Sequence, residues 1–207
     1  MIECPLGQEI IKRIKNGSCV GDPELDSLYP AFARDLSNTH WTPITIAKKA
    51  AAFTVKASGS KVLDVGSGVG KFCTVGALTT DGRFVGIEQR GALAEIADDI
   101  VNKFQIANVS FLNGNLDVVD WTTFDSIYLY NPFSENLDEK IRIDYTRLLE
   151  PQLYYAYVRY TQMQLDQMPS GSRVVIYNGF GGDLPPSYER THIEEINFMK
   201  LEVWDKK

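Results

Sequence analysis

Short apolar segments typical of β-strands alternate with helical segments along most of the chain. Strands are expected over 61–65, 84–88, 109–112, 126–130 and 173–177, and helices over 71–78, 92–104 and, bent or broken at Pro151, 138–167. Strands that alternate with helices form a parallel sheet covered by helices on both faces. In such sheets ligands bind beyond the carboxyl ends of the strands. A functional site is therefore expected at that edge.

The two ends of the chain complete the predicted architecture. Residues 1–58 read as a helical extension or lid, with a helix start at Asp22-Pro23 and a helix that Thr42-Pro43 caps and that runs to Ala57. The tail over 189–204 alternates apolar and polar residues and predicts two final strands. We predict an α/β fold: a Rossmann-like, doubly wound, mostly parallel seven-stranded sheet over 59–207, with a C-terminal antiparallel hairpin and an N-terminal helical lid.

Composition narrows the class of protein. The chain is 44% hydrophobic and 23% charged, as expected of a globular domain with a sizeable core. No membrane span or secretion signal is expected, and the scattered Cys4, Cys19 and Cys73 form no CxxC pair. These features predict a cytoplasmic protein without a metal site. The net charge of −6 does not favour nucleic acid as the partner, because such binding depends on Lys and Arg.

A glycine-rich turn follows the first expected strand. Closely spaced glycines let the backbone approach a ligand where a Cβ atom would collide. The spacing Gly66-x-Gly68-x-Gly70 is one residue shorter than the GxGxxG of dinucleotide-binding proteins. A phosphate-binding loop would need glycine and a hydroxyl where the chain has Val65 and Phe72. A strand-to-helix turn without any ligand is the plain alternative.

Together with the acidic residue before it, this turn resembles motif I of the class I methyltransferases that use S-adenosylmethionine. The segment is Asp64-Val65-Gly66-Ser67-Gly68-Val69-Gly70. Glu88 ends the second expected strand roughly 20 residues later, where an acidic side chain accepts hydrogen bonds from ribose hydroxyls. The resemblance assigns that role to Glu88. It also places Asn115 at the adenine amino group, although the family usually has an acidic residue there and a plain Asn-Gly turn explains 113–115 equally well.

The fourth expected strand runs into Asn131-Pro132-Phe133. This segment resembles the (Asp/Asn)-Pro-Pro-(aromatic) motif of methyltransferases that act on amino groups, with the second proline missing. An Asn oxygen and a backbone carbonyl accept hydrogens from an amine and orient its lone pair, and an aromatic ring walls off the site. Proline fixes the turn. A simple Asn-Pro turn after a buried strand is the alternative.

Across roughly 40–134 the chain is similar to the seven-strand protein-lysine methyltransferases, whose segment over the methionine half of the cofactor looks like His40-Trp41-Thr42-Pro43. For Thr42 the helix-cap interpretation is preferred. The resemblance implies S-adenosylmethionine as cofactor and Asn131, Pro132 and Phe133 as the catalytic residues. The cofactor-binding residues it implies are Asp64, Gly66, Ser67, Gly68, Gly70, Glu88, Gln89, Asn115, Leu116 and Thr42.

These observations predict a methyltransferase whose acceptor is an amine, on a protein lysine or a small molecule. The alternatives are a methyltransferase that acts on oxygen or nucleic acid, and a module of the same fold that binds the cofactor without transfer. A nicotinamide oxidoreductase or a nucleotide hydrolase is disfavoured by the spacing of the turn. A homodimer is also considered, because Tyr154 and Tyr157 lie at helical spacing and suit a lid helix or a dimer face.

Overall fold

The seven strands form one mixed sheet, in a computed structural model that describes residues 5–207. Cys4 lies outside these residues. The strand order is β3-β2-β1-β4-β5-β7-β6. Strands β1 to β5 pair in parallel, and β7 is antiparallel to both β5 and β6. The strands are β1 (Lys61–Val65), β2 (Arg83–Glu88), β3 (Val109–Asn113), β4 (Ser126–Tyr130), β5 (Arg173–Tyr177), β6 (Tyr188–Ile196) and β7 (Met199–Lys206).

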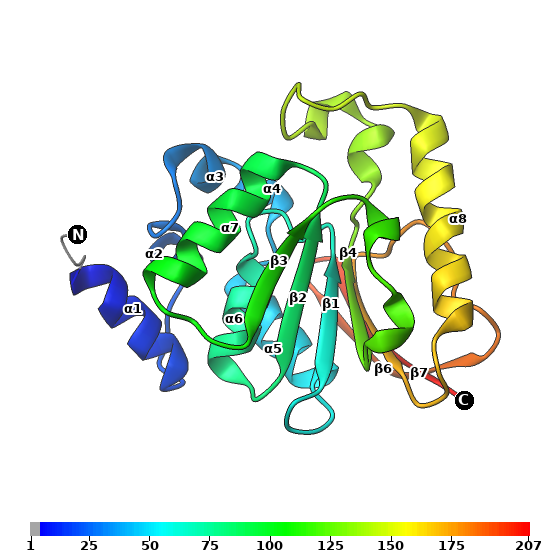
Figure 1. Ribbon diagram of the computed structural model, residues 1–207, viewed down its shortest axis with the longest axis horizontal. Coiled ribbons are helices and arrows are strands. Elements are labelled where there is room, and N and C mark those ends of the chain that lie inside the picture. The colour runs from blue at the N-terminus through cyan, green and yellow to red at the C-terminus, as the bar shows by residue number, and fades with distance from the viewer. Residues whose placement is uncertain (1–4) are drawn as a thin grey trace.

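Helices cover both faces of this sheet (Figure 1). The face toward the N-terminal part of the chain packs against α5, α6 and α7, and the opposite face packs against α8 and short 3-10 turns. The α-helices are α1 (Pro5–Lys15), α2 (Asp22–Asp26), α3 (Ala31–Asp35), α4 (Ser37–His40), α5 (Ile44–Thr54), α6 (Lys71–Thr79), α7 (Gly91–Lys103) and α8 (Pro151–Gln167). The 3-10 turns are η1 (Leu116–Val118), η2 (Trp121–Thr123), η3 (Ser134–Asn136) and η4 (Glu139–Ile141). The predicted α/β architecture, with its C-terminal antiparallel hairpin, is confirmed.

Two helix predictions were wrong in detail. The helical segment expected from Asp138 begins only at Pro151, where proline suits the first turn because its missing N–H has no partner there. Residues 138–150 instead form η4 and an irregular connection. In addition, α5 ends at Thr54 and has Pro43, not Thr42, at its N-cap position. The Thr42 hydroxyl lies 3.1 Å from the Tyr128 hydroxyl, so it joins α5 to β4 instead of capping the helix.

The buried ammonium group of Lys71 joins the N-terminal helices to the sheet layer. Lys71 is the first residue of α6, and its side chain is 2% exposed. Its Nζ lies 2.6 Å from Asp22 and 2.7 Å from Asp26 of α2, and it donates to the Ser37 hydroxyl of α4 at 3.0 Å. A buried cation of this kind is stable only with such partners.

The Lys71 contacts predict a large loss of stability when the cation is removed. Lys71→Met leaves the carboxylates of Asp22 and Asp26 without their partner, and the free energy of unfolding should fall by about 3 kcal/mol. Urea denaturation measures this change. The exposed Lys12 of α1 is the matched control, and Lys12→Met should change stability by less than about 0.5 kcal/mol. Similar small effects from both variants would show that the Lys71 cluster contributes little.

Candidate active site

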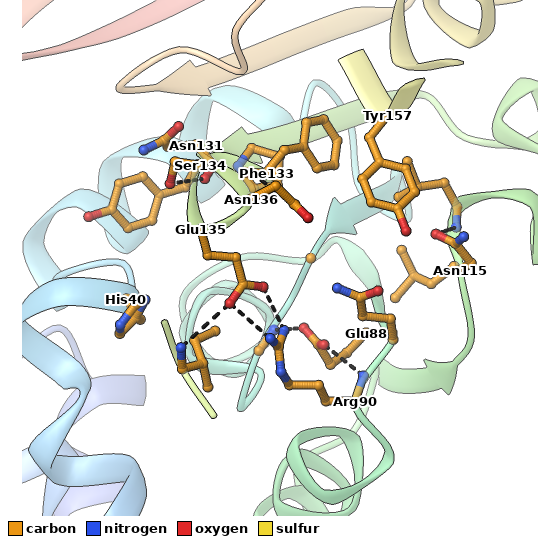
Figure 2. A pocket seen from close by; sticks show the side chains of 18 of the residues that line it. His40, Glu88, Arg90, Asn115, Asn131, Phe133, Ser134, Glu135, Asn136 and Tyr157 are labelled. Atoms are coloured by element: carbon orange, nitrogen blue, oxygen red, sulfur yellow. Dashed lines mark hydrogen bonds and ion pairs between the residues drawn. The ribbon is translucent and has the colours of Figure 1, made fainter. Parts of the chain in front are cut away.

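A cavity lies beyond the carboxyl ends of β1, β2 and β4, the edge at which the sequence predicted a site (Figure 2). Residues from every predicted part of the site line it, including Gly66, Gly68, Glu88, Gln89, Asn115, Leu116, Asn131, Pro132 and Phe133. A smaller cavity adjoins it and is lined by Thr42, Asp64, Gly66, Ser67, Lys71 and Tyr128, among others. The structure therefore brings the predicted residues together, with Gly70 as the exception.

The glycine turn after β1 is held against β2 by backbone hydrogen bonds. The N–H groups of Gly66 and Ser67 both donate to the Ile87 carbonyl at 3.0 Å. The residues at 66, 68 and 70 all have φ between +55° and +74°, a conformation that glycine adopts without steric cost. The turn therefore requires glycine for its backbone conformation as well as for space.

Each glycine of the turn meets a different neighbour. A Cβ atom at Gly66 would lie 3.2 Å from the Pro132 side chain, so the two turns after β1 and β4 pack directly together. At Gly68 it would lie 2.5 Å from the ring of Trp41, in the segment 40–43 that the resemblance places over the cofactor. At Gly70 it would lie 2.3 Å from Phe111. Gly70 lines neither cavity and lies close to Phe111 of β3, and its role in cofactor binding stays a prediction.

Glu88, the last residue of β2, stabilises the glycine turn through hydrogen bonds. Its carboxylate accepts from the N–H of Gly68 at 3.0 Å and from the N–H of Arg90 at 2.8 Å. The side chain is buried, and this burial raises its pKa in spite of both hydrogen bonds. Because each carboxylate oxygen has a second lone pair, these bonds leave acceptor capacity toward the cavity.

Asn115 is exposed at the far side of the cavity from Asn131 (Figure 2). Its side-chain oxygen accepts from the N–H of Leu116 at 2.9 Å and so caps η1. The buried Leu116 side chain forms part of the cavity wall beside it. This hydrogen bond gives Asn115 a structural role, and its placement at the adenine amino group stays a prediction.

Asn131 has a strained backbone at the end of β4. Its φ is +40°, and its N–H donates to the carbonyl of Gly179, after β5, at 2.9 Å. Non-glycine residues in this conformation cost free energy, and the surrounding structure must hold them there. The half-buried Asn131 side chain lines the larger cavity, next to Pro132 and Phe133.

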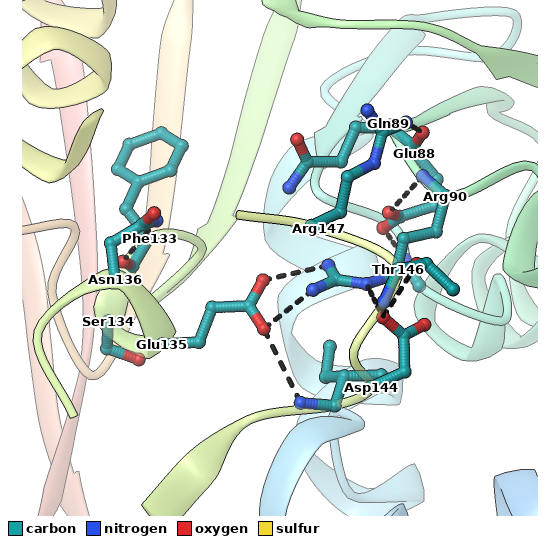
Figure 3. A network of polar contacts seen from close by, with 12 residues as sticks. Glu88, Gln89, Arg90, Phe133, Ser134, Glu135, Asn136, Asp144, Thr146 and Arg147 are labelled. Atoms are coloured by element: carbon teal, nitrogen blue, oxygen red, sulfur yellow. Dashed lines mark hydrogen bonds and ion pairs between the residues drawn. The ribbon is translucent and has the colours of Figure 1, made fainter. Parts of the chain in front are cut away.

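A polar network that the sequence did not reveal closes one side of the cavity (Figure 3). The buried guanidinium of Arg90 forms two hydrogen bonds of 2.8 Å to Glu135 of η3 and a third of 3.2 Å to Asp144. Arg147 donates to the backbone carbonyl of Gln89. These contacts tie the connection 138–150 to the end of β2. Sequence spacing gave no signal for them because the partners lie far apart in the chain.

Asp64 is a fully enclosed carboxyl group in the smaller cavity. Burial raises its pKa to about 7, and a hydrogen bond from the Cys73 thiol at 3.4 Å opposes that rise only partly. Beside it, the buried Ser67 hydroxyl has no hydrogen-bond partner within residues 5–207. A buried hydroxyl of this kind costs free energy unless a ligand or water supplies the partner.

The raised pKa of Asp64 predicts that the stability of the folded protein depends on pH. Between the ordinary value of 3.8 and about 7, the folded protein keeps the Asp64 proton that the unfolded chain releases. The free energy of unfolding therefore falls as pH rises through this window, by on the order of 1 kcal/mol per pH unit from this group. Asp64→Asn removes this pH-dependent contribution. The stability of the variant relative to the parent should therefore increase from pH 4 to pH 7 and stay constant above pH 7.

Urea denaturation at several pH values measures the difference between the two proteins. The exposed Asp81→Asn variant controls for the loss of one negative charge elsewhere. A stability difference between Asp64→Asn and the parent that stays constant from pH 4 to pH 8 would contradict the raised pKa.

Within residues 5–207, no helix is long and apolar enough to cross a membrane. Over the same residues, no group of three or more His, Cys, Asp and Glu side chains is arranged to hold a metal ion.

Comparison with known structures gives many similar folds. An RNA methyltransferase from Salinibacter ruber, in complex with S-adenosyl-L-homocysteine, is 19% identical with a TM-score of 0.59, over 80% of this chain and 92% of that one. TrmN from Thermus thermophilus is 17% identical and has the same TM-score; the match covers 86% of this chain and 52% of TrmN. MtNAS, in complex with MTA and tNA, is 14% identical with a TM-score of 0.55; the match covers 98% of this chain and 70% of MtNAS.

These likenesses confirm the Rossmann-like methyltransferase fold. The comparison with curated proteins finds no match. A family model described as a methyltransferase domain matches residues 56–173, which is more than half of the chain and includes the glycine turn, Glu88 and Asn131. The specific resemblance to protein-lysine methyltransferases stays a prediction. The chain belongs to the methyltransferase domain family and is an S-adenosylmethionine-dependent methyltransferase.

Proposed function

We propose that this methyltransferase transfers its methyl group to an amine, on a protein lysine or a small molecule. The observation that carries the proposal is the placement of Asn131. Asn131 has a strained backbone and lines the larger cavity, and the adjoining Pro132 packs directly on Gly66 of the glycine turn. An amide oxygen at this position is suited to accept a hydrogen from an amine and orient its lone pair.

The side chains around the two cavities fit the methyl donor. Glu88, Asn115 and Leu116 are proposed to hold the adenosine end in the larger cavity, where Glu88 retains acceptor capacity for ribose hydroxyls. In the smaller cavity, the Asp64 carboxyl suits an ammonium group, and Ser67 lines the same cavity. Thr42 and Lys71 complete that end. When bound, S-adenosylmethionine supplies an activated methyl group on a positively charged sulfur.

The remaining work of the protein is orientation and exclusion of water. Holding the reactants in line supplies several kcal/mol of the barrier. Phe133 is 5% exposed and packs against Tyr157 of α8, with ring centroids 5.5 Å apart, so it walls the acceptor side. We further propose that residues 1–58 act as a lid on the domain 59–207, since His40, Trp41 and Thr42 contribute to the cavity walls.

The glycine turn predicts a specific loss of cofactor affinity. The side chain introduced by Gly68→Val collides with the Trp41 ring, which lines both cavities, so the wall of the cofactor site must change. The affinity for S-adenosylhomocysteine, measured by calorimetry, should fall at least about 100-fold, a loss of roughly 2.7 kcal/mol.

Gly171→Val is the matched control. Gly171 also has a positive φ, +84°, but a Cβ atom there would meet no atom within 4 Å. This variant should lose some stability through backbone strain and keep its cofactor affinity. A folded Gly68→Val protein with normal affinity would contradict the assignment of the turn.

Two measurements test the amine acceptor. Purified protein receives methyl-labelled S-adenosylmethionine and a cell extract, which is then divided by protease, nuclease and size filtration. Label that remains with protein or small molecules, on nitrogen, supports the proposal. Label that nuclease releases identifies RNA or DNA as the substrate and overturns it.

Asn131→Ala tests the orienting role in the same assay. Turnover should fall by at least about 100-fold, while the melting-temperature shift caused by S-adenosylhomocysteine should be retained, because the side chain acts on the acceptor. NAD and ATP are the negative ligand controls. Unchanged turnover would remove Asn131 from the acceptor site.

A further inference from the structure

The two cavities meet at a junction of four residues. His40, Trp41, Gly66 and Tyr130 line both of them. This inference rests on the proposed function, in which adenosine binds in the larger cavity and the amino-acid end in the smaller one. The charged sulfur joins those two ends, so it would lie near the junction. The four shared residues would then be close to the methyl group that is transferred.

Only one of these four residues is equipped to exchange a proton near neutral pH. Gly66 has no side chain, and the Trp41 N–H already donates to the Ala33 carbonyl at 2.7 Å. Burial raises the pKa of Tyr130 above its ordinary value of 10, so its hydroxyl stays neutral. The imidazole of His40 is half-buried and makes no hydrogen bond to residues 5–207.

His40 also lies on the acceptor side of the cavity. In Figure 2 it appears on the same side as Asn131 and Ser134, whereas Glu88 and Asn115 are on the other side. It ends α4, and its ring is 5.7 Å from that of Trp41, which fixes the neighbouring wall through the bond to Ala33. The helix end and the adjacent indole thus hold the imidazole at the junction.

We propose that His40 is the catalytic residue that accepts the proton of the acceptor amine. The acceptor ammonium gives one proton to the neutral imidazole and keeps the lone pair. That lone pair forms the new nitrogen–carbon bond, the carbon–sulfur bond of the methyl donor breaks, and its electrons leave with the sulfur. The imidazolium then returns its proton to water.

The surroundings of His40 favour the neutral form that this step requires. Burial lowers the pKa of His40 below its ordinary value of 6.5; Glu135 opposes the change and Arg90 adds to it. The Arg90–Glu135 ion pair places both charges near the ring while leaving little net charge. The other titratable groups that line the two cavities are Asp64, Lys71, Glu88, Tyr128, Tyr130 and Tyr157.

The position of His40 is tested first by a measurement that needs no turnover. The chain has two histidines, so His40→Gln and His192→Gln assign both imidazole signals in proton NMR. His192 lies on β6 against Phe53 and outside both cavities. The pKa of His40 is measured with S-adenosylhomocysteine, whose sulfur is neutral, and with S-adenosylmethionine. The second compound should lower this pKa by about one unit more, because its sulfur carries a positive charge that disfavours the imidazolium.

The outcomes separate this inference from the proposed function. A melting temperature that neither compound changes would refute the proposed use of the cavities. Binding of both compounds with identical effects on His40 would overturn the inference alone. The His192 signals, which report on a distant site, should not respond to either compound.

Turnover supplies the second test, with the extract fraction that accepts label as substrate. His40→Gln should lower the rate about 100-fold and leave the affinity for S-adenosylhomocysteine nearly unchanged. The activity of the parent should fall as the pH is lowered, because acid protonates His40. The rate of His40→Gln should not show this fall. His192→Gln should behave as the parent. A His40→Gln enzyme with the parent rate and pH profile would overturn the role.

Discussion

The carboxylate of Glu88 holds together the parts of the molecule on which the site depends. It accepts one N–H from the glycine turn and one from the start of α7, so a single side chain fixes the ends of β1 and β2 relative to each other. Both oxygens face a buried environment in which an unpaired carboxylate would be costly. The shape of the turn and the position of an acidic group at the cavity therefore have the same physical cause.

Arg90 connects Glu88 to residues farther from the glycine turn. This residue places its N–H on Glu88 and its guanidinium on Glu135 and Asp144. Because Glu135 follows Asn131 by one short turn, the ion pair connects the end of β2 with the acceptor side of the cavity (Figure 3). A buried pair of this kind adds little net stability but strongly disfavours arrangements that separate its partners. Its main effect here is to fix the geometry of the cavity.

The sequence predicted those features that depend on local patterns. Strand–helix alternation located the sheet, the glycine spacing located the turn, and Glu88 and Asn131 fell at strand ends as expected. Contacts between distant segments had no local signal. Lys71 belongs to an apolar helix, and only the fold brings Asp22 and Asp26 of α2 to it.

Contacts between distant segments also explain the positions of two residues that local spacing did not reveal. Gly70 has the same spacing as its neighbours in the motif, but Phe111 of β3, and not the cavity, lies opposite it. Thr42 matched a helix cap, yet the hydroxyl of Tyr128 in the folded protein offered a buried partner instead. In both cases the contact is with a residue from another strand. Local preference is a weak guide where such tertiary contacts compete.

The charges around the cavities explain how one site can favour the donor over the product of the proposed reaction. Desolvation raises the pKa values of both Asp64 and Glu88, so each carboxylate is costly until a cation approaches it. A positively charged methyl donor bound in the two cavities would offset part of that cost. After transfer the sulfur is neutral and the attraction weakens, while the water-excluding walls of Trp41 and Phe133 remain unchanged. The same buried carboxylates would therefore favour the charged donor over the product, whose sulfur is neutral.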